Sequence, residues 1–209
     1  MVHSSDPNSL KGKGQAWSLV KASTIAYSVM AVVGFEICWW YHKSVKTLMG
    51  PLTYDHRSTA AIIVAAIVFL MLVQKLMEDF FPTYGAFKRR MSAIFSGLGW
   101  FGVFWLALIS SFGEELLFRG AIQPFLGLWF TSLVFGLLHL DPEGGVSAWT
   151  VWAMLAGVVL GAATEVTGSL WPAVVIHFVI NLVGLRSLAK SEPKPMKSTQ
   201  DIAGGQGRS

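Results

Sequence analysis

The chain has 209 residues, of which 53% are hydrophobic and 13% are charged, and its formal net charge is +4. Soluble domains carry about 25% charged residues, so this composition predicts an integral membrane protein with a single domain. The one cysteine, Cys38, excludes intrachain disulfides and cysteine-rich metal sites. The basic residues lie in predicted loops and tails, which suits the lipid bilayer with its anionic headgroups and argues against a nucleic-acid partner.

The N-terminal part is predicted to be a flexible tail followed by a first membrane span. Residues 1–16 are polar and contain no apolar core with a cleavage site, so we expect no removable signal peptide. The first span is predicted at Trp17–Tyr41, and its last three residues, Trp39-Trp40-Tyr41, suit a headgroup interface. Glu36 is expected at this interface near Lys43 or, alternatively, facing an internal cavity.

A polar loop at 42–58 leads to a second predicted span, Thr59–Met77. At about 1.5 Å per residue this span is long enough for a hydrocarbon core about 30 Å thick. Residues 78–90 are polar and basic and are predicted to form a loop. A long third helix should then begin near Met91 and continue through the acidic pair at 114–115 toward Pro124.

The C-terminal half is predicted to contain three further spans and a tail. Turns at 123–127, 141–145 and 167–169 separate the spans Leu128–Leu140, Ser147–Thr164 and Leu170–Leu188. In the fifth span, Ala153, Gly157 and Gly161 recur at every fourth residue, which predicts close approach of a neighbouring helix. Residues 189–209 are predicted to be disordered. The fold class is therefore an all-α membrane protein, with about six transmembrane helices bundled around a buried polar site.

The orientation follows from the distribution of basic residues. With six spans, the side that carries both termini also carries most of the lysines and arginines. The positive-inside rule then places both termini in the cytoplasm.

The most unusual stretch is Gly113–Arg119, which places Glu114, Glu115 and Arg119 in one of the most apolar parts of the chain. The preceding residues Ala93–Phe112 contain no charge. Ionisable groups inside a membrane are costly, and such a cluster indicates a functional site by default. The alternative is a structural ion pair that joins two helices.

Three further polar residues could join this cluster. His139 follows the fourth predicted span, and His177 and Asn181 share one face of the sixth because they are four residues apart. At about 1.5 Å per residue, all three lie roughly 14–20 Å from the turns that precede their helices, and Glu114 lies at a similar depth. Taken singly, each histidine could be interfacial and the asparagine could be a packing contact.

Together these residues contain the groups that water attack on an amide requires. Glu114 is the candidate general base for a bound water, and His139 could hold that water or protonate the leaving amine. His177 and Asn181 could donate hydrogen bonds to the oxyanion. Glu115 and Arg119, four residues apart, would form a buried pair that supports the site.

Three motifs in this order and spacing carry a family resemblance: Glu-Glu-x-x-x-Arg-Gly at 114–120, Phe-x-x-x-His ending at His139, and His-x-x-x-Asn starting at His177. They resemble the CAAX protease and bacteriocin-processing (CPBP) family of intramembrane proteases, which includes the CAAX prenyl endopeptidases. The resemblance covers about Met91–Leu188 and points to a compact bacterial member in the inner membrane.

By this resemblance, Glu114 and His139 activate the water, His177 and Asn181 form the oxyanion site, and Glu115, Arg119 and Phe135 support them. The family has been described as metal-dependent and as glutamate-dependent. If zinc binds, Glu114, His139 and His177 would be its ligands. The metal-free interpretation, with no cofactor, is favoured because Asn181 suits an oxyanion donor better than a ligand.

The function predicted from the sequence is endopeptidase cleavage of a membrane-anchored protein or peptide. Two alternatives remain: a non-catalytic immunity or scaffold protein of the same family, and a proton-coupled transporter that uses the carboxylates as a relay. The substrate, its prenylation and the oligomeric state do not follow from the sequence.

Overall fold

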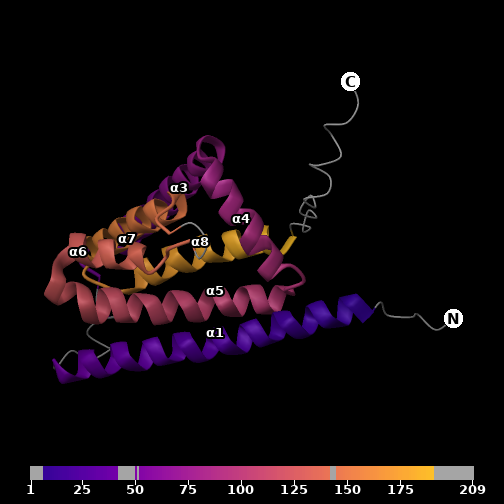
Figure 1. The fold of residues 1–209 in the computed structure, drawn as a ribbon. Helices are drawn as coiled ribbons and strands as arrows, with labels where there is room; N and C mark the ends of the chain where they lie inside the picture. Colours follow the sequence, from indigo (N-terminus) through magenta and orange to yellow (C-terminus); the bar gives the residue numbers. More distant parts are fainter. Residues whose placement is uncertain (1–6, 42–49, 51, 142–144, 191–209) are drawn as a thin grey trace.

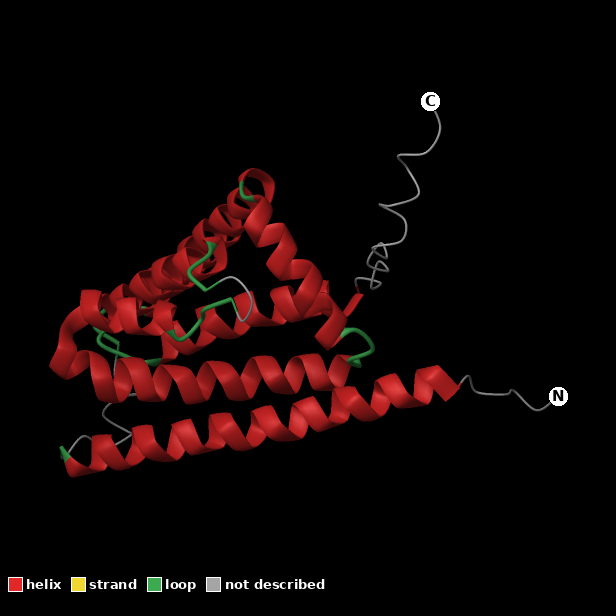
Figure 2. Cartoon of the chain, viewed as in Figure 1, coloured by secondary structure: helices red, strands yellow, loops and turns green. Residues whose placement is uncertain are grey.

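The computed structural model describes residues 7–41, 50, 52–141 and 145–190, and these residues form helices joined by short loops (Figure 2). The helices in chain order are α1 (Pro7–Trp40), α3 (His56–Phe80), α4 (Pro82–Phe95), α5 (Trp100–Glu115), the π-helix η1 (Leu116–Ile122), α6 (Gln123–Leu137), α7 (Ala148–Thr167) and α8 (Trp171–Lys190). Within these ranges the only β-type pairing is an isolated bridge between Asp141 and Gly145. The chain is thus a helical integral membrane protein.

Five helical segments of the described chain are long and apolar enough to cross a membrane. Four of them, in α1, α3, α7 and α8, confirm the first, second, fifth and sixth predicted spans. The third and fourth predicted spans fall in one segment of 38 residues, Trp100–Leu137. A straight helix of that length would measure about 57 Å, far more than a hydrocarbon core. Gly127, at the predicted turn, has φ 72° and kinks this segment, but the predicted count of six is not confirmed.

Residues 78–90 were expected to form a loop, and this prediction is wrong. Helix α3 continues to Phe80, and α4 begins at Pro82, in the first-turn position that tolerates proline. Tyr84 and Phe87 lie on its buried face while Arg89 is exposed. The basic residues that suggested a loop therefore belong to an amphipathic helix whose buried face carries Tyr84 and Phe87.

Two predicted boundaries also differ. The third helix was expected to run unbroken from Met91, but α4 ends at Phe95 and α5 begins at Trp100, with Gly97 between them at φ 81°. Helix α1 begins at Pro7, inside the expected N-terminal tail. Residues 1–6 of that tail and 191–209 of the C-terminal tail lie outside the described residues, as do most of the first loop (42–49 and 51) and residues 142–144 of a predicted turn.

Helix α5, which carries Glu114 and Glu115, lies between two other helices. It packs against α1 on one side and α8 on the other, and η1 continues it along α1 (Figure 1). Helices α6 and α7 pack together, and α3 packs against α7 and α8. Helix α4 packs against α7 and α8.

Glycines permit the closest helix contacts. A Cβ atom on Gly113 would lie 2.6 Å from the backbone oxygen of Tyr27, so α1 can reach α5 only because residue 113 lacks a side chain. A Cβ atom on Gly157 would lie 3.2 Å from the Cα atom of Ser132, which places the predicted small-residue stripe of α7 against α6. The predicted close approach is therefore confirmed.

The contact at Gly113 predicts opposite effects of one substitution at two helical glycines. Gly113→Ala should lower the free energy of unfolding by about 1–3 kcal/mol, because a backbone oxygen cannot yield to the new methyl group. Gly184→Ala, where no atom lies within 4 Å of the new Cβ, should raise it by about 0.5–1 kcal/mol. The unfolding temperatures of the purified proteins in detergent measure both changes. Equal shifts in the two variants would contradict the close α1–α5 contact.

Candidate active site

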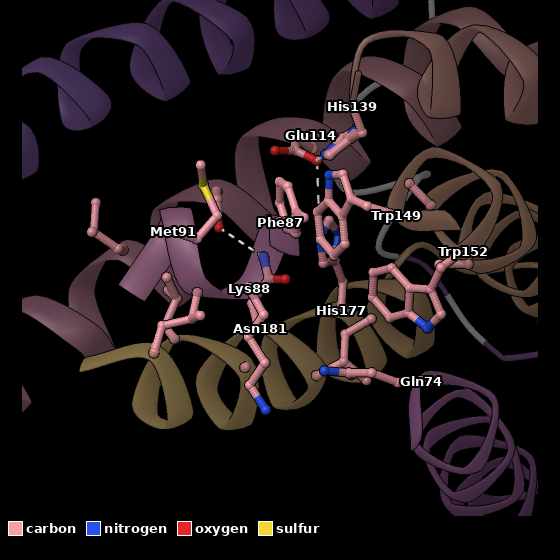
Figure 3. A pocket seen from close by; sticks show the side chains of 18 of the residues that line it. Gln74, Phe87, Lys88, Met91, Glu114, His139, Trp149, Trp152, His177 and Asn181 are labelled. Atoms are coloured by element: carbon pink, nitrogen blue, oxygen red, sulfur yellow. Dashed lines mark hydrogen bonds and ion pairs between the residues drawn. The ribbon is translucent and has the colours of Figure 1, made fainter. Parts of the chain in front are cut away.

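The Glu114 carboxylate lies where three helical segments meet. Glu114, near the end of α5, is 5% exposed. Its Oε2 atom is 3.8 Å from Nε2 of His139, which follows α6, and 3.9 Å from Nε2 of His177 on α8. Figure 3 shows Glu114 and His139 next to each other at one end of the pocket. The structure thus brings together three of the four residues predicted to be catalytic.

Hydrogen bonds fix the orientation of both imidazole rings. Nδ1 of His177 lies 2.7 Å from Oε1 of Glu115, and Nδ1 of His139 lies 2.7 Å from the backbone oxygen of Phe135. A backbone carbonyl and an ionised carboxylate only accept hydrogen bonds, so each Nδ1 carries a proton. In the neutral rings, Nε2 is then an acceptor that faces Glu114.

Three acceptor atoms therefore point at one position. Distances of 3.8 and 3.9 Å are too long for direct hydrogen bonds, and Oε2 of Glu114 has no hydrogen-bond partner among the described residues. A water molecule, which has two protons to donate, matches such a position.

The same three atoms are the zinc ligands that the resemblance offers as an alternative. Tetrahedral zinc with bonds of about 2.0–2.2 Å would set neighbouring ligand atoms about 3.3–3.6 Å apart, closer than the 3.8 and 3.9 Å found here. Within the described part of the chain, no group of three or more His, Cys, Asp or Glu side chains is placed to hold a metal ion. As they stand, the three atoms are farther apart than tetrahedral zinc requires.

Glu115 is fully buried and is held from two sides. Its Oε2 lies 3.2 Å from Nε of Arg119, and its Oε1 receives the hydrogen bond from His177. Arg119 also donates to the backbone oxygen of Gly157 at 3.1 Å and lies 4.5 Å from the centre of the Phe135 ring. This network joins η1, α6, α7 and α8 behind the Glu114 carboxylate.

Asn181 lies one helical turn beyond His177 and lines the same cavity as Glu114. Its Nδ2 atom donates to Oγ of Ser110 at 3.0 Å. An amide nitrogen has two protons, so the second remains for a ligand in the cavity.

The cavity has a volume of about 340 Å³ and two chemically different ends. Glu114, the two histidines and Asn181 form the polar end. An aromatic wall leads away from it: Trp149 stacks on Phe87 at 4.6 Å and on Trp152 at 5.0 Å between ring centres. Figure 3 shows this wall between the Glu114 end and Gln74. Tyr84 also lines the cavity, and burial raises the pKa of its hydroxyl, which therefore stays neutral.

The sequence did not identify several residues of this cavity. Tyr27 of α1 lines it and makes a side-chain hydrogen bond to Glu114, and no motif spacing connects two residues so far apart. Ser110 lies four residues before Glu114, a spacing that does place both on one helix face. Glu36 is exposed and does not line the cavity, so the alternative that it faces an internal cavity is wrong.

Residues 95–183 match the model of a family described as type II CAAX prenyl endopeptidase Rce1-like. Over this segment the chain is similar to the Rce1-like family. The Rce1-like segment contains every candidate catalytic and supporting residue predicted above, and the predicted CPBP resemblance is confirmed. Helices α1 and α3 and all but the last residue of α4 lie outside it.

The chain is also similar to the uncharacterized protein YpbD of Bacillus subtilis. The two are 32% identical over 126 residues, which cover 57% of this chain and 64% of YpbD. The match thus spans less than two thirds of that relative. No solved structure gives a significant match to the chain.

The buried Glu115–Arg119 pair predicts a large loss of stability when one partner is removed. Arg119→Met should lower the free energy of unfolding by about 3–5 kcal/mol, because the Glu115 carboxylate stays buried without its cation. Adding Glu115→Gln should recover part of this loss. The unfolding temperatures of both single variants and the double variant in detergent test the coupling.

The control is another pair at the same spacing, Lys75 and Asp79, whose side chains are 67% and 46% exposed. Lys75→Met should change the free energy of unfolding by less than about 1 kcal/mol. If Arg119→Met has an effect as small as Lys75→Met, the pair does not hold the site together.

Proposed function

We propose that the protein is an intramembrane endopeptidase that hydrolyses a peptide bond of a membrane-associated protein or peptide. The observation that carries the proposal is the convergence of Glu114 Oε2 with Nε2 of His139 and His177 in a largely apolar cavity. The description of the matched family supports the same reaction class. We propose further that both termini lie in the cytoplasm, on the side that carries most of the basic residues.

In the proposed reaction, a water bound between Glu114 and Nε2 of His139 gives a proton to Glu114 as its oxygen attacks the peptide carbonyl. His139 holds the water by its Nε2 lone pair. When the C–N bond breaks, the leaving amine takes a proton from Glu114 or through His139. No covalent enzyme intermediate forms, and the base returns to its starting state.

The oxyanion is stabilised by donors on α8. The free N–H of Asn181 can donate directly, because it does not depend on protonation. His177 can donate from Nε2 only as an imidazolium, since its Nδ1 proton is committed to Glu115. Glu115 is the counter-ion that stabilises this charged ring, and the ion pair with Arg119 holds Glu115 in place.

The test compares membrane peptides from cells that contain the intact protein with those from cells that contain Glu114→Gln. A peptide whose cleavage requires Glu114 is then assayed with purified protein. Glu114→Gln should slow cleavage by about 10²–10⁴-fold, and Asn181→Ala should lower kcat by about 10²–10³-fold. The matched control is Glu165→Gln, the same chemical change on α7 at a residue that does not line the cavity.

Undiminished cleavage by both Glu114→Gln and Asn181→Ala would refute the assignment. A protein that cleaves no membrane peptide, while its Glu114→Gln variant keeps full activity in cells, would favour the non-catalytic alternative. Glu114-dependent proton flux in liposomes without cleavage would favour the transporter alternative.

We also propose that cleavage needs no metal, because the three acceptors do not fit zinc as they stand. Treatment with 1,10-phenanthroline should leave the cleavage rate unchanged, and elemental analysis of the active protein should find zinc well below one equivalent. Loss of activity that added zinc restores would overturn this part of the proposal.

A further inference from the structure

Ser110 is a polar residue of the cavity to which neither the three motifs nor the proposed reaction assigns a role. It lies on α5, is 5% exposed, and lines the cavity together with Glu114 and Asn181. A buried hydroxyl beside a reaction site requires an account of its hydrogen bonds.

Two pairs of residues make contacts between α5 and α8, one helical turn apart. Glu114 faces His177 at 3.9 Å, and Ser110 faces Asn181 at 3.0 Å. On α5 the second residue comes four positions before the first, whereas on α8 it comes four positions after. The two helices therefore run antiparallel here, and the one-turn spacing His-x-x-x-Asn of α8 is matched by Ser-x-x-x-Glu on α5.

The hydrogen bonds of Ser110 determine which end of the Asn181 amide faces it. The Ser110 hydroxyl donates to the backbone oxygen of Ala107 at 3.3 Å, so its oxygen accepts the proton from Asn181 Nδ2. The terminal torsion of an asparagine is broad and roughly two-fold. Without Ser110, the amide oxygen could take the place of the nitrogen and turn an acceptor toward the oxyanion.

We propose that Ser110 is a positioning residue that holds the Asn181 amide with its nitrogen on the Glu114 side of the cavity, where its free N–H can reach the oxyanion. This inference rests on the proposed peptidase function. It adds a residue that acts through Asn181 and does not touch the reacting atoms.

The neighbouring residue Ser111 provides a matched control. It is also buried, and its hydroxyl donates to the same Ala107 oxygen at 2.6 Å. It does not line the cavity. Ser111→Ala therefore removes the same group from the same helix turn without removing a contact to Asn181.

The test uses a synthetic fluorescence-quenched form of the membrane peptide whose cleavage depends on Glu114. Ser110→Ala should lower kcat by about 10- to 100-fold with KM nearly unchanged, since a donor misplaced by about 1 Å can cost that much. Ser110→Thr keeps the hydroxyl and should restore most of kcat. In an Asn181→Ala background, Ser110→Ala should cause no further loss, because its effect passes through Asn181.

The outcomes separate this inference from the function on which it rests. If the wild type cleaves and Asn181→Ala is impaired, but Ser110→Ala matches Ser111→Ala, then Ser110 has no positioning role and the peptidase assignment stands. Full additivity of Ser110→Ala and Asn181→Ala would overturn the inference in the same way. If the wild-type protein cleaves no peptide, both the peptidase function and the positioning role of Ser110 are refuted. Unfolding temperatures of all variants show whether a loss of kcat reflects loss of the fold.

Discussion

The structure depends on the way in which one buried carboxylate is neutralised. Glu115 is fully buried, and an unpaired charge there would cost about 3–5 kcal/mol, a large part of a typical domain's margin of stability. Arg119 supplies the opposite charge and His177 supplies a hydrogen bond to this carboxylate. Because these partners come from η1 and α8, neutralising Glu115 also fixes how the two segments pack.

The chemistry of Glu114 follows from its neighbour. Since Glu115 takes the Nδ1 proton of His177, the other nitrogen of that ring faces Glu114 as an acceptor. The backbone oxygen of Phe135 does the same for His139. Glu114 itself is left with an oxygen that has no partner in the described chain. The Glu115 carboxylate thus stabilises the fold, while the adjacent Glu114 carboxylate stays available for a ligand. The two neighbouring glutamates therefore have different roles.

The residues of the candidate site were more predictable from the sequence than helix α4, which packs over the cavity. Charges within an apolar run, and His-x-x-x-Asn on one helix face, follow directly from helix period and from the cost of burying charge. They placed Glu114, His139 and His177 at one depth, and the structure brings them together. Ser110 could have been found by the same four-residue spacing. Tyr27 could not, because its approach depends on the missing side chain of Gly113 in another helix.

The errors arose where local composition and tertiary packing disagree. Lys88, Arg89 and Arg90 suggested a loop, yet α4 is a helix because its other face buries Tyr84 and Phe87 over the cavity. Arg90 forms an ion pair with the buried Asp141, two residues beyond His139, and this contact ties α4 to the site. The predicted count of six spans is not confirmed, because a π-helix and the kink at Gly127 connect α5 to α6 without a polar loop.

The cavity has a polar end and an aromatic wall, and the family resemblance covers the two unequally. The polar end lies wholly within the Rce1-like segment, so the likeness bears on the type of reaction. Part of the aromatic wall, Tyr84 and Phe87, belongs to α4 and lies outside that segment. If the proposed peptidase function holds, a substrate side chain at this wall would be selected partly by residues that the family model does not describe. Two proteins could share every motif residue of this chain and still cut different peptides, because the wall that contacts the substrate differs while the water-activating groups stay the same.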